Sequence, residues 1–140
     1  IIIASDRAKF GQPEIKVGAI PTVAAALLPK LIGRKQALEM IFTGDTLEAA
    51  EAKQIGLINK VVPAKELKKK ADELVGKMKD LSPTVLTLAK KAVYQGIDVG
   101  FKIALDGVTE VYLKELMGTE DAVEGLKAFL EKRKPEWKGK

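Results

Sequence analysis

The sequence contains no cysteine and no histidine. Without cysteine, a disulfide scaffold, a thiolate nucleophile and a cysteine metal site are excluded. Without histidine, the sequence lacks the commonest metal ligand and the usual base of a catalytic triad. Metal catalysis by these 140 residues would therefore need carboxylates alone, and we predict no metal site.

The sequence also lacks low-complexity tracts, a P-loop, a GxGxxG motif and any zinc-ligand spacing. With 46% hydrophobic and 31% charged residues, its composition is typical of a single soluble, intracellular domain. The opening residues Ile1-Ile2-Ile3-Ala4 have no basic segment before them, so they predict a buried strand and not a signal peptide. We therefore predict a cytoplasmic protein that does not bind membranes.

Positive charge exceeds negative charge by five, from 24 Lys and Arg against 19 Asp and Glu. The densest basic run covers residues 65–79, where apolar residues recur at helical spacing and most lysines fall on the opposite face. Acidic residues interrupt the run, and no aromatic side chain is interleaved to stack on bases. This pattern favours a solvated helix face, so we predict no nucleic-acid partner.

Helical patterns predominate after the first strands. We expect short strands at 1–5, 8–10 and 57–62, where apolar and β-branched residues cluster. Asp45 with Glu48 predicts a capping-box start for a helix over 47–54. So few strands cannot make a complete sheet core, and this predicts that the first strands pair with a missing part of the domain.

Three further helix ends are predicted from capping residues. Ser82 followed by Pro83 opens one helix, and apolar spacing predicts another over 101–116, ended by Gly118. Thr119 caps a last helix. Its last turn is expected to contain Lys132, Arg133 and Lys134, before Pro135 stops it.

A single carboxylate follows the second strand. It is Glu14, in the run Phe10-Gly11-Gln12-Pro13-Glu14-Ile15, just before a turn with Gly18 and Pro21. The residues alone favour a surface turn carboxylate, but the run is similar to a catalytic-glutamate motif. Together with later segments, the sequence resembles the enoyl-CoA hydratase/isomerase (crotonase) superfamily. These segments are 31–34, 37–40, 43–45, 49–56 and 125–135.

The resemblance implies an α/β crotonase-like fold, a spiral of strand–strand–helix turns followed by a helical region that trimerises. It implies that this chain is the C-terminal half of such a domain, mostly α-helical with two or three short strands. Residues 1–63 would be the end of the spiral core and 64–140 the trimerisation region. The expected assembly is a homotrimer or a dimer of trimers.

The resemblance also implies a lyase or isomerase of fatty acid metabolism that acts on an enoyl-CoA thioester. Glu14 would be the general acid/base, and no cofactor is implied because the acyl-coenzyme A is the substrate. In hydratases of the family a second glutamate assists. That glutamate and both oxyanion-hole N–H donors would lie before Ile1, so the isolated fragment is expected to be inactive.

Further site residues are implied around Pro21 and in the last helix. Many family members have a Gly-rich segment after this proline, whereas here Thr22 opens an apolar stretch that ends at Leu28. Pro21 and Thr22 are thus candidates to shape the acyl pocket for a cyclic or branched group, although 23–32 is equally typical of a buried helix kinked by Pro29. Phe129 would cover a neighbouring subunit's acyl pocket.

Lys132 would lie near the coenzyme's phosphates; the alternative is a lysine that only complements the helix dipole. For Phe129 the alternative is an ordinary core aromatic. Alternatives to the hydratase/isomerase function are a cyclic dienoyl-CoA hydratase or an acyl-CoA hydrolase of the same superfamily. Outside enzymes, a catalytically dead helical association module and a basic nucleic-acid binder are the alternatives.

Overall fold

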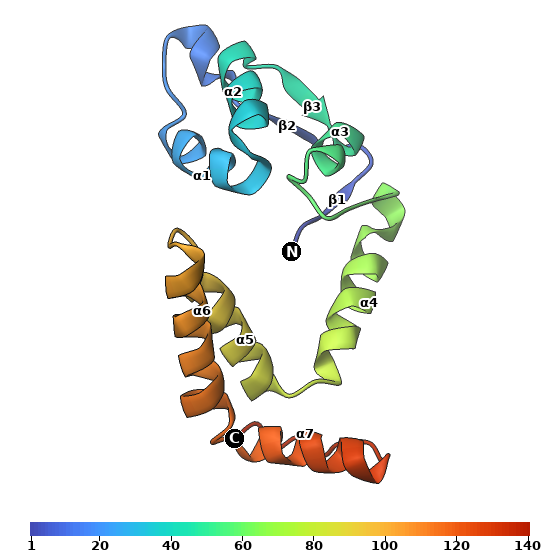
Figure 1. Cartoon of the computed structure of the whole chain (residues 1–140). Coiled ribbons are helices and arrows are strands. Elements are labelled where there is room, and N and C mark those ends of the chain that lie inside the picture. Colours follow the sequence, from blue (N-terminus) through green and yellow to red (C-terminus); the bar gives the residue numbers. More distant parts are fainter. The chain divides into compact units, whose positions relative to one another are not determined.

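The structure is a computed structural model that describes all residues, 1–140. It divides into two compact units, Ile1–Leu74 and Val75–Lys140. The proposed division at 63/64 stays a prediction. Helix α4 (Leu67–Lys79), which carries the basic run, crosses from one unit into the other (Figure 1).

Four short strands form two separate pairs in the first unit. β1 (Ile3–Ser5) pairs in parallel with β4 (Lys60–Val62), and β2 (Lys9–Gly11) pairs antiparallel with β3 (Thr46–Glu48). A two-stranded pair buries little by itself, and this unit has no larger sheet. The chain is thus mostly helical, as predicted, but it has four short strands where two or three were expected.

The additional strand, β3, corrects the predicted start of the third helix. The sequence placed a capping box at Asp45 and Glu48, whereas α3 covers Ala49–Gln54 and Glu48 is its N-cap. The backbone N–H of Glu48 donates to Glu51 Oε2 at 2.8 Å, so a capping box exists three residues later than expected. Pairing with β2 extends residues 46–48, and this tertiary contact overrides the local helix signal.

Helices supply most of the first unit's core. η1 (Pro13–Val17) is a short 3₁₀ helix, α1 (Thr22–Ile32) and α2 (Arg34–Thr43) lie side by side, and η2 (Ala64–Glu66) leads into α4 (Figure 1). One cluster of buried residues joins α1 to α2: Leu28, Ile32, Ala37, Met40 and Ile41. A second cluster joins the β1–β4 pair to α3: Ala4, Ala49, Ala52 and Ile58.

The second unit contains α5 (Pro83–Gln95), α6 (Phe101–Glu110), η3 (Val111–Leu116) and α7 (Glu120–Glu131). Two predicted caps are confirmed. Ser82 Oγ accepts from the N–H of Val85 at 3.1 Å, and Thr119 Oγ1 accepts from that of Ala122 at 3.1 Å. α5 lies alongside α6 and η3 (Figure 1).

The helix expected over 101–116 is not uniform, because its last part, η3, is a π-helix. The Met117 N–H donates to the carbonyl of Tyr112, five residues back, at 3.0 Å. In η3, Val111 is only 3% exposed, whereas its neighbour Tyr112 is exposed.

The end of α7 also differs from the prediction. The helix ends at Glu131, and Lys132 adopts the left-handed conformation (φ 54°), so Lys132, Arg133 and Lys134 lie beyond the last turn. Pro135 is therefore not the stop. Arg133 instead turns back onto Glu124 and Glu131, which supply stronger, charge-assisted hydrogen bonds than the helix dipole offers.

Candidate active site

Glu14 lies in the first turn of η1, directly after Pro13 at the helix start. The turn is closed behind it by Gly18, whose left-handed conformation (φ 77°) lets its N–H donate to the Ile15 carbonyl at 3.1 Å. The Ala19 N–H donates to the Glu14 carbonyl at 3.0 Å. The backbone of Glu14 is thus fixed by local hydrogen bonds.

The loop after α2 packs closely against η1 at Gly44. This buried glycine has φ 61°, and a Cβ there would lie 3.0 Å from Ile15 Cγ2 and 3.3 Å from the Gln12 carbonyl oxygen. Beside it, Lys16 Nζ is 3.2 Å from Asp45 Oδ1. The position of Glu14 therefore depends on a glycine thirty residues further along the chain.

One oxygen of the Glu14 carboxylate has no partner. Glu14 Oε2 is buried and accepts no hydrogen bond, and no other buried side-chain nitrogen or oxygen shares this property. Leaving such an acceptor unsatisfied costs about 1–3 kcal/mol, and more for a charged group. Native structures tolerate this cost mainly where the group has a function, and a carboxylate oxygen with free lone pairs can accept a proton.

A cavity of about 340 Å³ lies beside the chain leading to Glu14. Its walls come from β2, α1, α2 and adjoining loops: Ile2, Lys9, Phe10, Gly11, Gln12, Leu28, Met40, Leu57 and Ile58. This volume and mostly apolar lining are typical of a small-molecule site. A larger cavity of about 660 Å³, between α2, β3 and α3, is lined mainly by polar side chains.

Pro21 and Thr22 follow the Glu14 turn directly. Pro21 is buried at the start of α1, where its carbonyl accepts from the Ala25 N–H at 2.8 Å, whereas Thr22 is exposed. Of α1, only Leu28 and Ile32 are buried. The interpretation of 23–32 as a buried helix therefore holds for one face only, and the other face presents apolar side chains.

Phe129 and Lys132 belong to the second unit, whereas Glu14, Pro21 and Thr22 belong to the first. Phe129 is 81% exposed, so it is not a core aromatic within this chain. It lies in an exposed apolar set on α7 with Val123, Leu126 and Leu130. Lys132 is exposed too, and its N–H donates to the Phe129 carbonyl at 3.3 Å.

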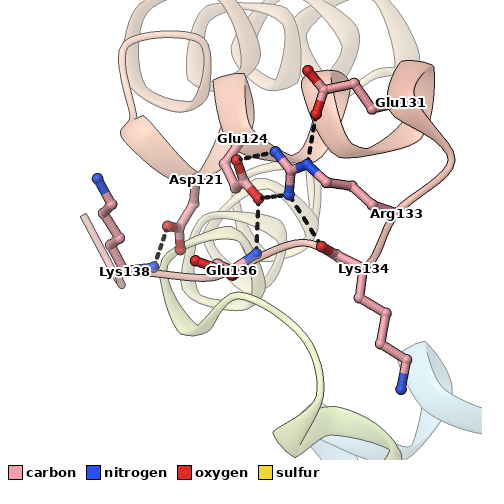
Figure 2. Close-up of polar contacts among 7 residues, drawn as sticks. All are labelled: Asp121, Glu124, Glu131, Arg133, Lys134, Glu136 and Lys138. Atoms are coloured by element: carbon pink, nitrogen blue, oxygen red, sulfur yellow. Dashed lines mark hydrogen bonds and ion pairs between the residues drawn. The ribbon is translucent and has the colours of Figure 1, made fainter.

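Arg133 and Glu124 hold the chain that leaves Lys132 (Figure 2). The guanidinium binds both Glu124 oxygens, with Nη1–Oε1 at 2.6 Å and Nη2–Oε2 at 2.9 Å, and its Nε donates to Glu131 at 2.6 Å. The N–H of Glu136 adds a bond to Glu124 at 2.8 Å. The Arg133 hydrogen bonds, and then that of Glu136, lower the pKa of Glu124 from 4.5 to about 2.

This pKa shift predicts how acid affects the second unit. Because the folded-state pKa of Glu124 lies below its ordinary value, its contribution to stability is present above pH 4.5 and is lost as the pH falls toward 2. Glu124→Gln should remove that part of the acid dependence and should destabilise the protein at neutral pH. Urea unfolding between pH 2 and 7 measures this; an unchanged pH profile in the variant would show that the pair contributes nothing.

Two residues important to the site were missed or misread in the sequence. Gly44 belongs to a segment that carries the family resemblance, Thr43-Gly44-Asp45, but its contact with η1 has no local signal. Asp121 was not identified as a site residue, yet it is completely buried and accepts hydrogen bonds from distant residues. Fully buried aspartates are rare, and the burial of a single side chain cannot be read from the sequence. This role of Asp121 therefore has no signal in the sequence.

No group of three or more Asp and Glu side chains is arranged to hold a metal ion. None of the helices combines the length and the apolar character that a membrane crossing requires.

Comparisons with known proteins agree on one family. The sequence profile described as Enoyl-CoA hydratase/isomerase matches residues 1–140. The chain is similar to the probable mitochondrial enoyl-CoA hydratase of Dictyostelium discoideum, with 38% identity over 141 residues, covering 100% of the chain and 50% of that protein. It is also 38% identical over 142 residues to the cyclohexa-1,5-dienecarbonyl-CoA hydratase of Thauera aromatica, covering 100% of the chain and 54% of the relative.

Solved structures show the same similarity. The enoyl-CoA hydratase of Bacillus anthracis superimposes with a TM-score of 0.90 at 39% identity, covering 99% of this chain and 54% of that one. An enoyl-CoA hydratase/isomerase from Mycobacterium paratuberculosis gives a TM-score of 0.94 at 28% identity, covering 100% and 53%. The chain thus spans about half the length of the relatives that it matches.

Proposed function

Since the chain belongs to the enoyl-CoA hydratase/isomerase family, we propose that the whole protein adds water to an enoyl-CoA thioester or shifts its double bond. The family and the crotonase-like fold predicted from the sequence motifs are confirmed by the matching profile and structures. We further propose that residues 1–140 form the C-terminal half of the catalytic domain. The whole protein is proposed to act in the cytoplasm, in fatty acid metabolism.

The observation that carries the proposal is the buried, unpartnered Oε2 of Glu14. In hydration, this carboxylate takes a proton from water as the water oxygen bonds to the β-carbon of the enoyl group. The electron pair of the double bond moves toward the thioester oxygen, and the proton taken by the carboxylate is then returned at the α-carbon, so that one water has been added in all. In isomerisation, the same oxygen would remove a proton from one carbon and return it to another.

The negative charge that develops on the thioester oxygen needs two N–H donors. We propose that a part of the protein outside these 140 residues supplies them, together with the second glutamate that a hydratase requires. Glu14 alone would then be the contribution of this chain to the reacting atoms. Acyl-coenzyme A enters as substrate, and the reaction needs no further cofactor.

Pro21 and Thr22 are proposed to shape the acyl site. Two observations support this. Pro21 and Thr22 lie at the start of α1, just after the η1 turn that carries Glu14, and α1 exposes apolar side chains beyond them. The alternative substrate, a cyclic dienoyl-CoA, is favoured by the name of the Thauera aromatica relative. A hydrolase of the same superfamily is a further alternative, since water activated by Glu14 could attack the thioester carbonyl instead.

Phe129 and Lys132 are proposed to act from the last helix. Phe129 is 81% exposed, and covering its ring with a ligand or another subunit would remove apolar surface from water. Lys132 is exposed, and its ammonium group could bind the phosphates of coenzyme A. We propose that Phe129 covers the acyl site of a neighbouring subunit and that Lys132 lies near the phosphates.

Exposed apolar side chains on α6 and α7 predict self-association. Phe101, Phe129 and Leu130 are each about four-fifths exposed. Burying such side chains against other copies gains about 25 cal/mol per Å² of apolar surface. We expect a homotrimer or a dimer of trimers, and Phe129→Asp should weaken it. Analytical ultracentrifugation tests this; a well-folded monomer throughout the micromolar range contradicts it.

The proposed reaction is tested by incubating the whole protein with enoyl-CoA thioesters, linear and cyclic. Hydration removes the conjugated double bond and adds the mass of one water, isomerisation leaves the mass unchanged, and hydrolysis releases free coenzyme A. Mass spectrometry of the products therefore identifies hydration and hydrolysis, and the absorbance of the conjugated enoyl thioester, with chromatographic separation, detects the isomer of unchanged mass. Finding none of these products with any thioester would refute the proposed function.

A further inference from the structure

Asp121, in the first turn of α7, is 0% exposed. Its Oδ1 accepts from the N–H groups of Lys138 and Gly139 at 2.7 and 3.2 Å, and its Oδ2 accepts from Ser82 Oγ and from the N–H of Gly139 at 3.0 Å. Its own N–H donates to the Lys140 carbonyl at 3.1 Å. One carboxylate thus joins the start of α5, the start of α7 and the end of the chain.

Residues 133–140, here called the strap, run back along α7 (Figure 2). Glu124 holds the near end through Arg133, and Asp121 holds the far end. Between them, the Trp137 ring lies against Gly125, where an added Cβ would be 3.2 Å from the ring, and its Nε1 donates to the Asp80 carbonyl at 2.9 Å. The strap therefore links α7 to the beginning of α5.

Apolar packing contributes little to the placement of α7. Only Asp121 and Ala128 of this helix are buried, and its large apolar side chains are exposed. The direction of the helix, and the left-handed turn at Lys132 that connects it to the strap, thus depend on polar contacts.

We propose that Asp121 is a positioning residue, which holds the strap against the start of α5 and so fixes Phe129 and Lys132 for acyl-CoA binding. The functional part of this inference rests on the proposed function of the protein. The structural part, that Asp121 keeps Trp137 against Gly125, does not depend on it.

Asp121→Asn is the appropriate variant because its size is unchanged. The carboxylate accepts from three different donor groups, two of them backbone N–H groups that cannot turn away. An amide offers one acceptor oxygen, and its NH₂ group would face one of these donors. The strap should detach while α7 itself, capped by Thr119, remains helical.

Two measurements test the inference. In the whole protein, KM for the enoyl-CoA should rise about tenfold while kcat stays within about twofold of wild type, because the reacting carboxylate is elsewhere. In the 140-residue chain, whose single tryptophan is Trp137, fluorescence emission should shift to the red as the ring becomes solvated. Asp72→Asn is the matched control: it makes the same change at an exposed side chain of α4, whose ion pair with Lys68 does not involve the strap, and it should alter neither measurement.

Gly125→Ala provides an independent variant, should Asp121→Asn fail to fold. Alanine favours the helix, but its Cβ would lie 3.2 Å from the Trp137 ring, so the ring must move by a few tenths of an ångström. KM and the emission maximum should therefore change in the same direction as in Asp121→Asn, but by less, with undiminished helicity. Unchanged emission in a folded variant overturns the strap, and a red shift with unchanged KM overturns its role in binding. Failure of the proposed function would instead appear as wild-type inactivity, with the fluorescence shift intact.

Discussion

Glu14→Gln in the whole protein is expected to lower kcat by about two to four orders of magnitude, the usual contribution of a positioned acid or base. Glutamine preserves the shape of the side chain and its fit in the η1 turn, but it cannot exchange a proton. The loss should therefore appear in kcat, since the coenzyme is proposed to be bound near Lys132 and not by Glu14. Steady-state kinetics with the substrate identified by product analysis measures it.

Glu39→Gln is the matched control, because it makes the same change at an exposed carboxylate on α2. It should leave kcat within about twofold of wild type. Equal losses in the two variants would indicate a general effect of charge and not a role for Glu14 in proton transfer.

Gly44→Ala is expected to have the largest effect on stability within the first unit. The left-handed conformation of this residue costs alanine about 1–2 kcal/mol. Its Cβ would also lie 3.0 Å from Ile15 Cγ2 and 3.3 Å from the Gln12 carbonyl, and such overpacking adds about 1–3 kcal/mol. Urea unfolding measures the free-energy loss, and kcat should fall as well because η1 carries Glu14.

Gly18→Ala is the control for this prediction. Gly18 has a similar left-handed conformation, with φ 77° against 61°, but nothing lies within 4 Å of a Cβ there. It should lose only the conformational term, about 1–2 kcal/mol. If both variants lose the same free energy, the contact between Gly44 and η1 does not hold the turn in place.

The sequence predicted best where the signal is local. Ser82 and Thr119 cap their helices as expected, because a cap depends on a side chain and an N–H three residues away. Glu14 was found through the run from Phe10 to Ile15, whose resemblance to the family is confirmed for the chain as a whole. Its role as acid/base stays a prediction.

The errors arose where distant residues decide the structure. β3 forms because β2, more than thirty residues earlier in the chain, is available to pair with it, and this partner lies outside the window that capping or periodicity examines. The π turn of η3 and the return of Arg133 to Glu124 involve residues nearer in sequence, but neither follows from apolar spacing or from a capping motif. The burial of the Glu14 oxygen is equally nonlocal, since it depends on how the rest of the unit packs around η1.

The central claim, that Glu14 transfers a proton on an acyl-CoA substrate, is tested most directly by measuring kcat and thioester affinity together for the wild type and Glu14→Gln. Affinity is taken from the dissociation constant of a non-reactive thioester. We predict that kcat falls at least about 100-fold while this constant changes less than about threefold. A variant that keeps more than about a tenth of the wild-type kcat would show that the Glu14 carboxylate is structural.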